Sequence, residues 1–300
     1  MNKKVLITGS NGLLGQKLVK LLKSNFNVLA TSTGENLIFD KDGYLYQTMD
    51  ITNFQELKLT FDSFKPDYVI NTAAMTNVDG CEDSKSKCDE VNVFAVRKMT
   101  SLCQQYNSHF IHISTDFIFD GENGPYKEED TPNPLSYYGK SKFESEKIVS
   151  SSEINWTILR TIILYGTADQ LQRSNIVLWG RSALKDGQKL NIIDDQFRSP
   201  TLAEDLAEAC KLVIEKDALG IFHISGKDIM SIFEMVERMA EFYKCDKSNI
   251  NKISSITLNQ KAKRPPKTGF ILEKAIRELD YKPHSFEQGL QILETQLIRK

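Results

Sequence analysis

The chain has 300 residues, 40% of them hydrophobic and 26% charged, so it is long enough to bury a large core, and its composition excludes disordered and fibrous classes. Its formal net charge of −2 provides no overall basic field for nucleic acid or an anionic membrane. Five cysteines without a CxxC pair argue against a disulfide framework and a zinc knuckle, and no apolar run approaches the ~20 residues of a membrane helix. We therefore expect a cytoplasmic protein that binds neither nucleic acid nor membranes.

Short apolar runs alternate with segments of helical period through the first half of the chain. The predicted strands are 5–8, 27–30, 68–74 and 110–115, and the predicted helical segments are 13–24, 54–64 and 85–106. This alternation is typical of βαβ units and predicts an α/β fold with a doubly wound parallel sheet, Rossmann-like in architecture. In such sheets the ligand lies beyond the C-terminal ends of the strands.

The second half of the chain has a looser pattern. We predict helices at 202–216, 231–243 and 285–297 and a strand at 220–224. The chain would then divide into a dinucleotide-binding domain, 1–165, and a mainly substrate-binding lobe, 166–300. No linker rich in Pro, Gly or Ser separates them, so the boundary is soft and some later segments return to the first domain.

A glycine-rich loop follows the first predicted strand. Gly9, Gly12 and Gly15 are three residues apart and precede a predicted helix, whose N-terminus offers N–H groups to a pyrophosphate. The spacing is GxxGxxG rather than the usual GxGxxG, and an ordinary βα turn is the alternative interpretation. We predict that this loop binds a dinucleotide through Gly9, Asn11, Gly12, Leu13 and Leu14.

The residues that would select the cofactor are less distinctive. The end of the second predicted strand, 31–33, reads Thr-Ser-Thr, with neither the acid that marks NAD nor an arginine for NADP, so NADP or NAD can serve. Asp50, followed by Ile51, is a candidate adenine contact, and a helix cap is an equal alternative. The strand at 68–74 ends in small side chains that would allow close cofactor approach: Asn71, Ala73 and Ala74.

Tyr138 and Lys142 are four residues apart, so on a helix they share one face. A tyrosine pKa near ~10 would have to fall to ~7 for proton transfer at neutral pH, which corresponds to roughly 4 kcal/mol. A buried ammonium and a positive nicotinamide could supply that stabilisation, whereas a solvated helix face is the alternative. Ser114 and Thr115 place hydroxyls at the end of a predicted strand, where a substrate carbonyl could accept a hydrogen bond.

These segments together resemble a known superfamily. TGSNGLLG at 8–15, STD at 114–116 and YGKSK at 138–142 resemble the extended short-chain dehydrogenases/reductases. VINTAAMTNVDGCE, the stretch from HISTDFIFDG to YYGKSKFESEK, DDQFRSPT at 194–201 and KRPP at 263–266 resemble the dTDP-4-dehydrorhamnose reductase family. The likeness runs nearly end to end.

The resemblance implies reduction of a 4-keto-6-deoxy sugar nucleotide by hydride from a nicotinamide, without a metal. Tyr138 would donate the proton, and Lys142 would lower its pKa and hold the nicotinamide ribose. Thr115 would bind the keto oxygen, with Ser114 as its substitute. The implied substrate contacts are the acids Asp79 and Glu82, in a loop that lines the sugar pocket, and the arginines Arg198 and Arg264, which would bind the diphosphate.

Each of these implied contacts has an alternative. The acids could be solvated loop residues and the arginines surface salt bridges. Asn92 would brace the catalytic region or be a polar helix residue. Trp179 could stack on a nucleotide base, but we expect it in the core.

Two departures bear on specificity and assembly. The family's RTSWVYG motif reads RTIILYG here, at 160–166, so a tryptophan next to the site is lost. Lys17 stands where some members carry a glutamate that takes part in a magnesium-bridged dimer. We leave a homodimer open as an alternative. We do not expect one bridged by magnesium, because the positive charge of Lys17 repels Mg²⁺. Two other functions also stay open: a reductase or epimerase of another nucleoside diphosphate sugar, and a non-catalytic cofactor-binding subunit like the regulatory chain of methionine adenosyltransferase.

Overall fold

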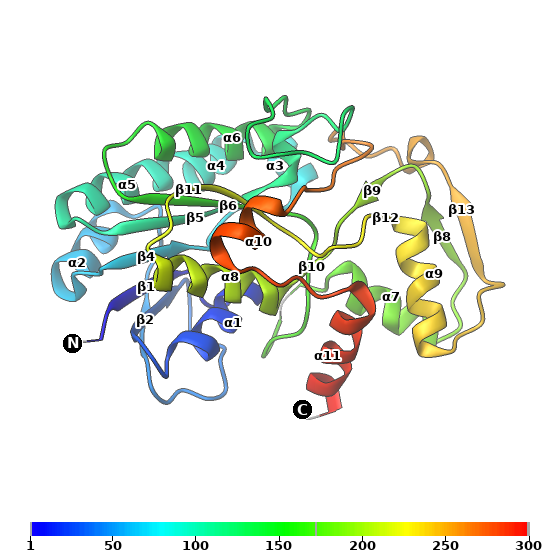
Figure 1. The fold of residues 1–300 in the computed structure, drawn as a ribbon, viewed down its shortest axis with the longest axis horizontal. Helices are drawn as coiled ribbons and strands as arrows, with labels where there is room; N and C mark the ends of the chain where they lie inside the picture. Colours follow the sequence, from blue (N-terminus) through cyan, green and yellow to red (C-terminus); the bar gives the residue numbers. More distant parts are fainter. Residues whose placement is uncertain (1, 172, 299–300) are drawn as a thin grey trace.

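A seven-stranded parallel sheet forms the centre of the protein in the computed structural model, which describes residues 2–171 and 173–298 (Figure 1). The strand order is β11-β6-β5-β4-β1-β2-β3. The strands are β1 (Lys4–Thr8), β2 (Asn27–Ser32), β3 (Leu45–Thr48), β4 (Tyr68–Asn71), β5 (His109–Thr115), β6 (Trp156–Thr161) and β11 (Gly220–Ile224). This confirms the predicted doubly wound α/β fold. The winding reverses between β1 and β4, where such sheets bind ligands.

Helices cover both faces of the sheet. One layer packs against Val5 and Ile7 and the other against Leu6, because alternate residues of a strand point to opposite faces. The first layer contains α1 (Leu13–Leu22), α8 (Ala203–Lys216) and α10 (Glu273–Leu279), and the second contains α2 (Phe54–Phe64), α5 (Ala95–Tyr106) and α6 (Tyr137–Ser150). Since both faces are covered, the central strands are almost wholly buried.

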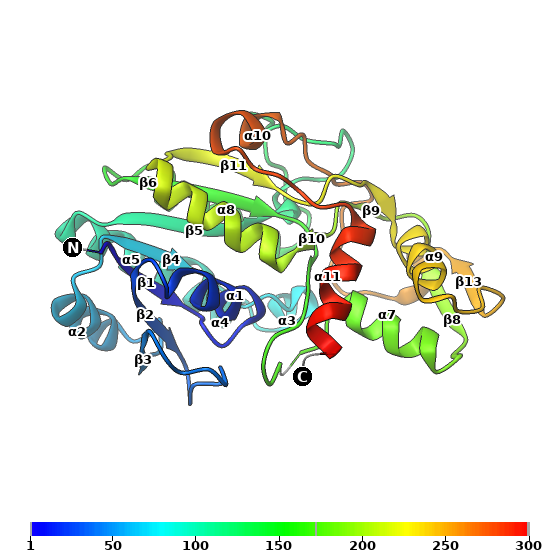
Figure 2. The same cartoon turned by 60° about the horizontal axis from the view of Figure 1, so that its bottom comes forward.

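A smaller group of elements lies beyond the C-terminal ends of the strands (Figure 2). Its core is separate from the two cores of the sheet. The group consists of α7 (Ile176–Lys185), β8 (Leu190–Ile193), α9 (Ile232–Tyr243), β13 (Ile250–Ile253) and α11 (Phe286–Ile298). Two short strand pairs, β7 (Leu164–Tyr165) with β10 (Thr201–Leu202) and β9 (Phe197–Arg198) with β12 (Met230–Ser231), complete the second half.

Two expectations for the second half concern the domain boundary at residue 165 and the burial of Trp179. Helix α8 and strand β11 return to the sheet layer, and the domain boundary at residue 165 stays a proposal. The expectation that Trp179 lies in the core is wrong, because its side chain on α7 is 44% exposed. Helix α7 packs its apolar face on α9, and Trp179 lies on the other face.

Short helical segments connect the main elements. The segment predicted as one helix at 85–106 is divided by a π-turn, η1, which often marks a functional site. The short helical segments are α3 (Val78–Asp83), α4 (Lys85–Asp89), the π-turn η1 (Glu90–Phe94), and the 3₁₀ turns η2 (Asp116–Ile118) and η3 (Ser255–Leu258). Within the described residues, we find no helix whose length and apolarity would let it cross a bilayer.

Candidate active site

A cavity of about 830 Å³ opens at the C-terminal ends of β1, β4 and β5, where the winding of the sheet reverses. Its walls include the glycine loop, the segments after β4 and β5, the first turn of α6 and the loop before α7. The described residues that line it are Asn11 to Gly15, Ser32, Thr33, Leu37, Asn71, Thr72, Ala74, Thr76, Val78, Ile113 to Phe117, Tyr138, Thr161, Ile163, Leu164, Leu171, Arg173 to Asn175 and Leu206.

The glycine loop fits a pyrophosphate. Gly9 has φ +70°, and a Cβ atom there would lie 2.7 Å from the backbone nitrogen of Ala73. This brings the segment after β4 directly against the loop. Gly12 caps α1 without a side-chain hydrogen bond, so the first N–H groups of the helix are available to an anion. Leu13 and Leu14 line the cavity beside it.

Asn11 has a structural task in addition to its place in the cavity wall. Its Nδ2 donates to the carbonyl of Glu35 at 2.8 Å, and its Oδ1 accepts from the N–H of Leu37 at 3.0 Å. These bonds hold the loop after β2 next to the glycine loop. Ser32 and Thr33 at the start of that loop line the cavity, as a selector of the cofactor would.

The other predicted cofactor residues divide into two groups. Asn71 and Ala74 line the cavity. Ala73, Asp50 and Ile51 do not. The Asp50 carboxylate accepts hydrogen bonds from Thr52, and Ile51 is buried. Asn53, rather than Asp50, caps helix α2. An adenine contact at Asp50 stays a prediction.

Helix α6 positions Tyr138. Ser136 caps the helix through the N–H of Gly139, and a Cβ atom on Gly139 would lie only 2.2 Å from the carbonyl oxygen of Phe117. The missing side chain therefore lets the helix approach the residues that follow β5. Tyr138 is then buried against them, and its phenol hydrogen bonds with the Thr115 hydroxyl.

Burial shifts the pKa of both predicted catalytic groups on α6. Burial raises the pKa of the Tyr138 phenol, and the hydrogen bond between Tyr138 and Thr115 opposes that rise. Burial also lowers the pKa of Lys142 to about 8. Proton transfer at neutral pH would need a lowered pKa of Tyr138. The protein alone does not provide it, because desolvation of the phenolate dominates.

The two hydroxyls at the end of β5, Ser114 and Thr115, differ in their hydrogen bonds. Thr115 Oγ1 accepts from the N–H of Phe117 and donates to Asp116 Oδ1, each at 3.2 Å. Ser114 Oγ is buried, lines the cavity and has no hydrogen-bond partner. An unsatisfied buried hydroxyl is costly, so Ser114 is well suited to bond a ligand.

Asn92 braces this region, as the resemblance implies. It lies in the π-turn η1 and is buried. Its side chain accepts from the N–H of Met75 at 2.8 Å and donates to the Met75 carbonyl at 3.1 Å and to Ser141 Oγ at 3.0 Å. It thereby ties the loop after β4 to helix α6.

The predicted substrate acids lie near the cavity but outside its described lining. Asp79 forms a two-pronged ion pair with Arg264, at 2.7 and 3.3 Å, so the structure brings both predicted residues together but pairs them with each other. Glu82 Oε1 accepts from the N–H of Tyr137 at 2.7 Å, at the start of α6. Their contacts with substrate stay predictions.

Arg198 is buried and bonded within the protein. Its guanidinium donates to the carbonyls of Phe197 and Pro265, each at 2.7 Å, and its Nε lies 3.7 Å from Asp116. Asp116 also accepts from the Thr268 hydroxyl at 2.5 Å. This cluster joins the end of β5 to the segment near KRPP. A diphosphate could bind Arg198 only by displacing these bonds, so diphosphate binding by Arg198 stays a prediction.

Two further residues line the cavity: Arg173, which no motif indicates, and Ile163, which lies in the altered motif at 160–166. Arg173 is the only Lys or Arg among the described lining residues, and it follows a loop without a recognisable pattern. Ile163 lines the cavity with φ +31°, a strained value for a β-branched residue. It occupies the place of the tryptophan that the sequence lost, so that departure does lie at the site.

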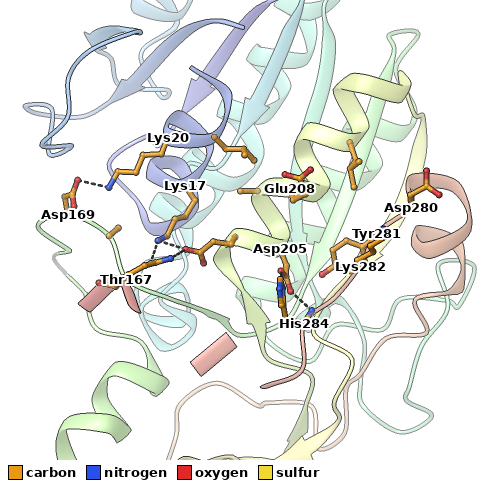
Figure 3. A pocket seen from close by; sticks show the side chains of 16 residues that line it. Lys17, Lys20, Thr167, Asp169, Asp205, Glu208, Asp280, Tyr281, Lys282 and His284 are labelled. Carbon is orange, nitrogen blue, oxygen red and sulfur yellow. Dashed lines mark hydrogen bonds and ion pairs between the residues drawn. The ribbon is translucent and has the colours of Figure 1, made fainter. Parts of the chain in front are cut away.

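A second cavity, of about 1,030 Å³, lies between α1, α8 and the segment at 280–284 (Figure 3). It shares no described lining residue with the first. Three pairs of oppositely charged groups lie in its wall: Lys17 with Glu204 at 2.6 Å, Lys20 with Asp169 at 2.9 Å and His284 with Asp205 at 2.5 Å. We therefore assign the candidate active site to the cavity beside Tyr138.

Comparisons with known proteins agree with this geometry. The chain matches the RmlD substrate binding domain model over residues 3–298. It is 32% identical to a dTDP-4-dehydrorhamnose reductase of Aggregatibacter actinomycetemcomitans, over 96% of this chain and 97% of the relative. It is also 31% identical to methionine adenosyltransferase 2 subunit beta of Bos taurus, over 84% of this chain and 76% of that protein.

A solved structure of similar architecture is the dTDP-4-dehydrorhamnose reductase from Bacillus anthracis in complex with NADP. It has a TM-score of 0.86 and 26% identity and covers 99% of this chain and 100% of the other. The chain therefore belongs to the RmlD substrate binding domain family, which confirms the resemblance to dTDP-4-dehydrorhamnose reductases that its sequence predicts.

Proposed function

We propose that this protein uses NADPH or NADH to reduce the 4-keto group of a 6-deoxy sugar nucleotide, in the manner of the dTDP-4-dehydrorhamnose reductases that it resembles. The observation that carries the proposal is the buried pair of Thr115 and Tyr138 at the cavity, with Lys142 one helical turn further along α6. A proton donor and a carbonyl-binding hydroxyl thus face the place where the sheet binds its ligand.

The chemistry divides between cofactor and protein. A reduced nicotinamide would supply the hydride to C4. The backbone N–H groups of Leu13 and Leu14 would hold its pyrophosphate at the N-terminus of α1, while the Gly12 N–H bonds the Gly9 carbonyl at 2.9 Å. Thr115 and the unpartnered Ser114 would bond the keto oxygen, and Tyr138 would give that oxygen its proton.

Arg173 is our candidate for the diphosphate of the sugar nucleotide. A guanidinium suits phosphate oxygens, and no other described lining residue is a Lys or Arg. Arg198 has less support because its donors are already engaged. Arg264 would have to exchange Asp79 for a phosphate.

A non-catalytic role, as in the named methionine adenosyltransferase subunit, has less support. A cofactor-binding subunit has no need for a proton donor at the cavity, and this chain retains Thr115, Tyr138 and Lys142. A cytoplasmic location is part of the proposal, since all five cysteines are free thiols. Whether the chain forms a homodimer stays a prediction.

The test is consumption of NADPH and of NADH by the purified protein with dTDP-4-keto-6-deoxy-L-mannose. We expect Tyr138→Phe to lower turnover by about 10² to 10⁴ because it removes the proton donor, while NADPH still binds. Tyr137→Phe is the matched control: that phenol bonds Asp89 at 2.6 Å, and its loss should leave turnover nearly unchanged. Wild-type turnover in Tyr138→Phe would refute the mechanism. Cofactor binding without turnover in the wild type would favour another sugar nucleotide or the non-catalytic role.

A further inference from the structure

One buried amide joins two walls of the candidate active site. Gln16 lies in the first turn of α1, directly after the last glycine of the glycine loop, and its side chain is wholly buried. Its Nε2 donates to the Asn11 carbonyl of that loop at 3.1 Å and to the Asp169 carbonyl at 2.8 Å. Its Oε1 accepts from the Asp169 N–H at 2.8 Å. The amide thus connects the glycine loop to a segment 153 residues further along the chain.

These three hydrogen bonds require a glutamine side chain. Its nitrogen carries two N–H groups, each with a carbonyl acceptor, and its oxygen accepts the N–H of Asp169. A carboxylate at this position could still accept that N–H, but it has no proton to give to the two carbonyls. An apolar side chain would leave two carbonyls and one N–H without these partners, which is costly where water is excluded.

The side chain of Asp169 connects a third wall of the cavity. Its carboxylate accepts from Lys20 Nζ at 2.9 Å (Figure 3) and from the N–H of Phe39 at 3.2 Å. Phe39 lies in the loop after β2, and Thr33 at the start of that loop lines the cavity. Asp169 therefore contacts the glycine loop through Gln16 and the loop after β2 through its own carboxylate.

The chain turns sharply after Asp169 and then enters the cavity wall. Gln170 has φ +47°, an uncommon value for a residue other than glycine, so the surrounding fold must hold the backbone there. The two backbone bonds of Asp169 to Gln16 come directly before this turn. Leu171 and Arg173 follow it, and both line the cavity. The position of Arg173 relative to the glycine loop thus depends on Gln16.

We propose that Gln16 is a positioning residue that fixes the loop of Arg173 against the glycine loop, so that cofactor and sugar nucleotide bind next to each other in one cavity. The inference rests on the proposed function, because it takes Arg173 as the partner of the sugar-nucleotide diphosphate and the glycine loop as the pyrophosphate site. Thr115 and Tyr138 come from β5 and α6. Gln16 therefore acts on the binding of the two ligands rather than on proton transfer.

The experiment compares ligand binding and turnover in Gln16→Met, which keeps the length of the side chain and removes all three hydrogen bonds. We expect the Kd for NADPH and the KM for dTDP-4-keto-6-deoxy-L-mannose to rise about tenfold each, whereas kcat stays within about threefold of wild type. Gln47→Met is the matched control, because the Gln47 amide bonds Thr60 at 2.7 Å outside the described cavity lining, and it should change neither constant. Loss of stability alone would leave both constants unchanged in the folded protein.

A double-variant cycle tests whether Gln16 acts through Arg173. In the Arg173→Ala background, Gln16→Met should raise the KM for the sugar nucleotide by less than about twofold, because the guanidinium that it positions is gone. The Kd for NADPH should still rise about tenfold. An equal rise of KM with and without Arg173 would overturn this path.

A second variant keeps the test available if Gln16→Met does not fold. Lys20→Met removes only the ion pair between a partly exposed lysine and Asp169, so we expect it to raise both constants by about two- to threefold. Unchanged constants in every Gln16 and Lys20 variant that folds, or a loss confined to kcat, would overturn the inference and leave the proposed function intact. Failure of the wild-type protein to bind any pyridine dinucleotide would refute the proposed function itself.

Discussion

The approach of helix α6 to the sheet depends on one glycine. A Cβ atom added at Gly139 would lie 2.2 Å from the Phe117 carbonyl oxygen, more than 1 Å closer than an ordinary contact of 3.4–4 Å, and that oxygen belongs to the backbone, which cannot rotate away. Gly139→Ala must therefore displace α6 and move Tyr138 away from Thr115. A displacement of 1 Å at a reacting group costs about 10²-fold in rate.

Stability and turnover should respond differently to this change. Overpacking costs about 1–3 kcal/mol, and the better helix propensity of alanine returns up to about 1 kcal/mol, so we expect a net loss of about 1–2 kcal/mol in the free energy of unfolding. The matched control is Gly180→Ala in α7, where the nearest atom is the flexible end of Met239 at 3.0 Å. Denaturant unfolding and steady-state kinetics measure both quantities. A Gly139→Ala protein with wild-type turnover would refute the reasoning.

Two arginine substitutions separate structural from binding roles. Arg198→Met should destabilise the protein by about 3–5 kcal/mol, because it leaves the buried Asp116 carboxylate without its cation; an unchanged denaturation midpoint would contradict this. Arg173→Ala should leave the unfolding free energy within about 0.5 kcal/mol but raise the KM for the sugar nucleotide about tenfold, since the exposed guanidinium lines the cavity. An unchanged KM would exclude Arg173 from the diphosphate site.

The order of the elements was predictable from the sequence because local patterns decide it. Apolar runs become strands buried on both faces, and Gly9, followed by Gly12 at the start of a helical pattern, places the cofactor loop. The spacing of Tyr138 and Lys142 also predicts their common helix α6.

Partners of charged side chains were not predictable, because they join segments far apart in the chain. Asp79 and Arg264 are both polar residues in loops, and nothing in either loop indicates that they bind each other. Arg198 resembles a surface cation in the sequence, yet it is buried beside Asp116 and the carbonyls of two distant segments. Trp179, an apolar residue on an amphipathic helix, is exposed because α7 has only one packed face.

The largest difference between sequence and structure concerns charge at the site. The sequence argument placed a positive Lys142 beside Tyr138 to lower the tyrosine pKa. In the structure, burial favours the neutral form of both groups, since it raises the pKa of Tyr138 and lowers that of Lys142. His112 Nε2 lies 3.1 Å from Lys142 Nζ in the same buried region. A pKa of about 8 still leaves Lys142 mainly an ammonium near pH 7, so the positive charge that the sequence predicts near Tyr138 is retained at neutral pH although burial weakens it.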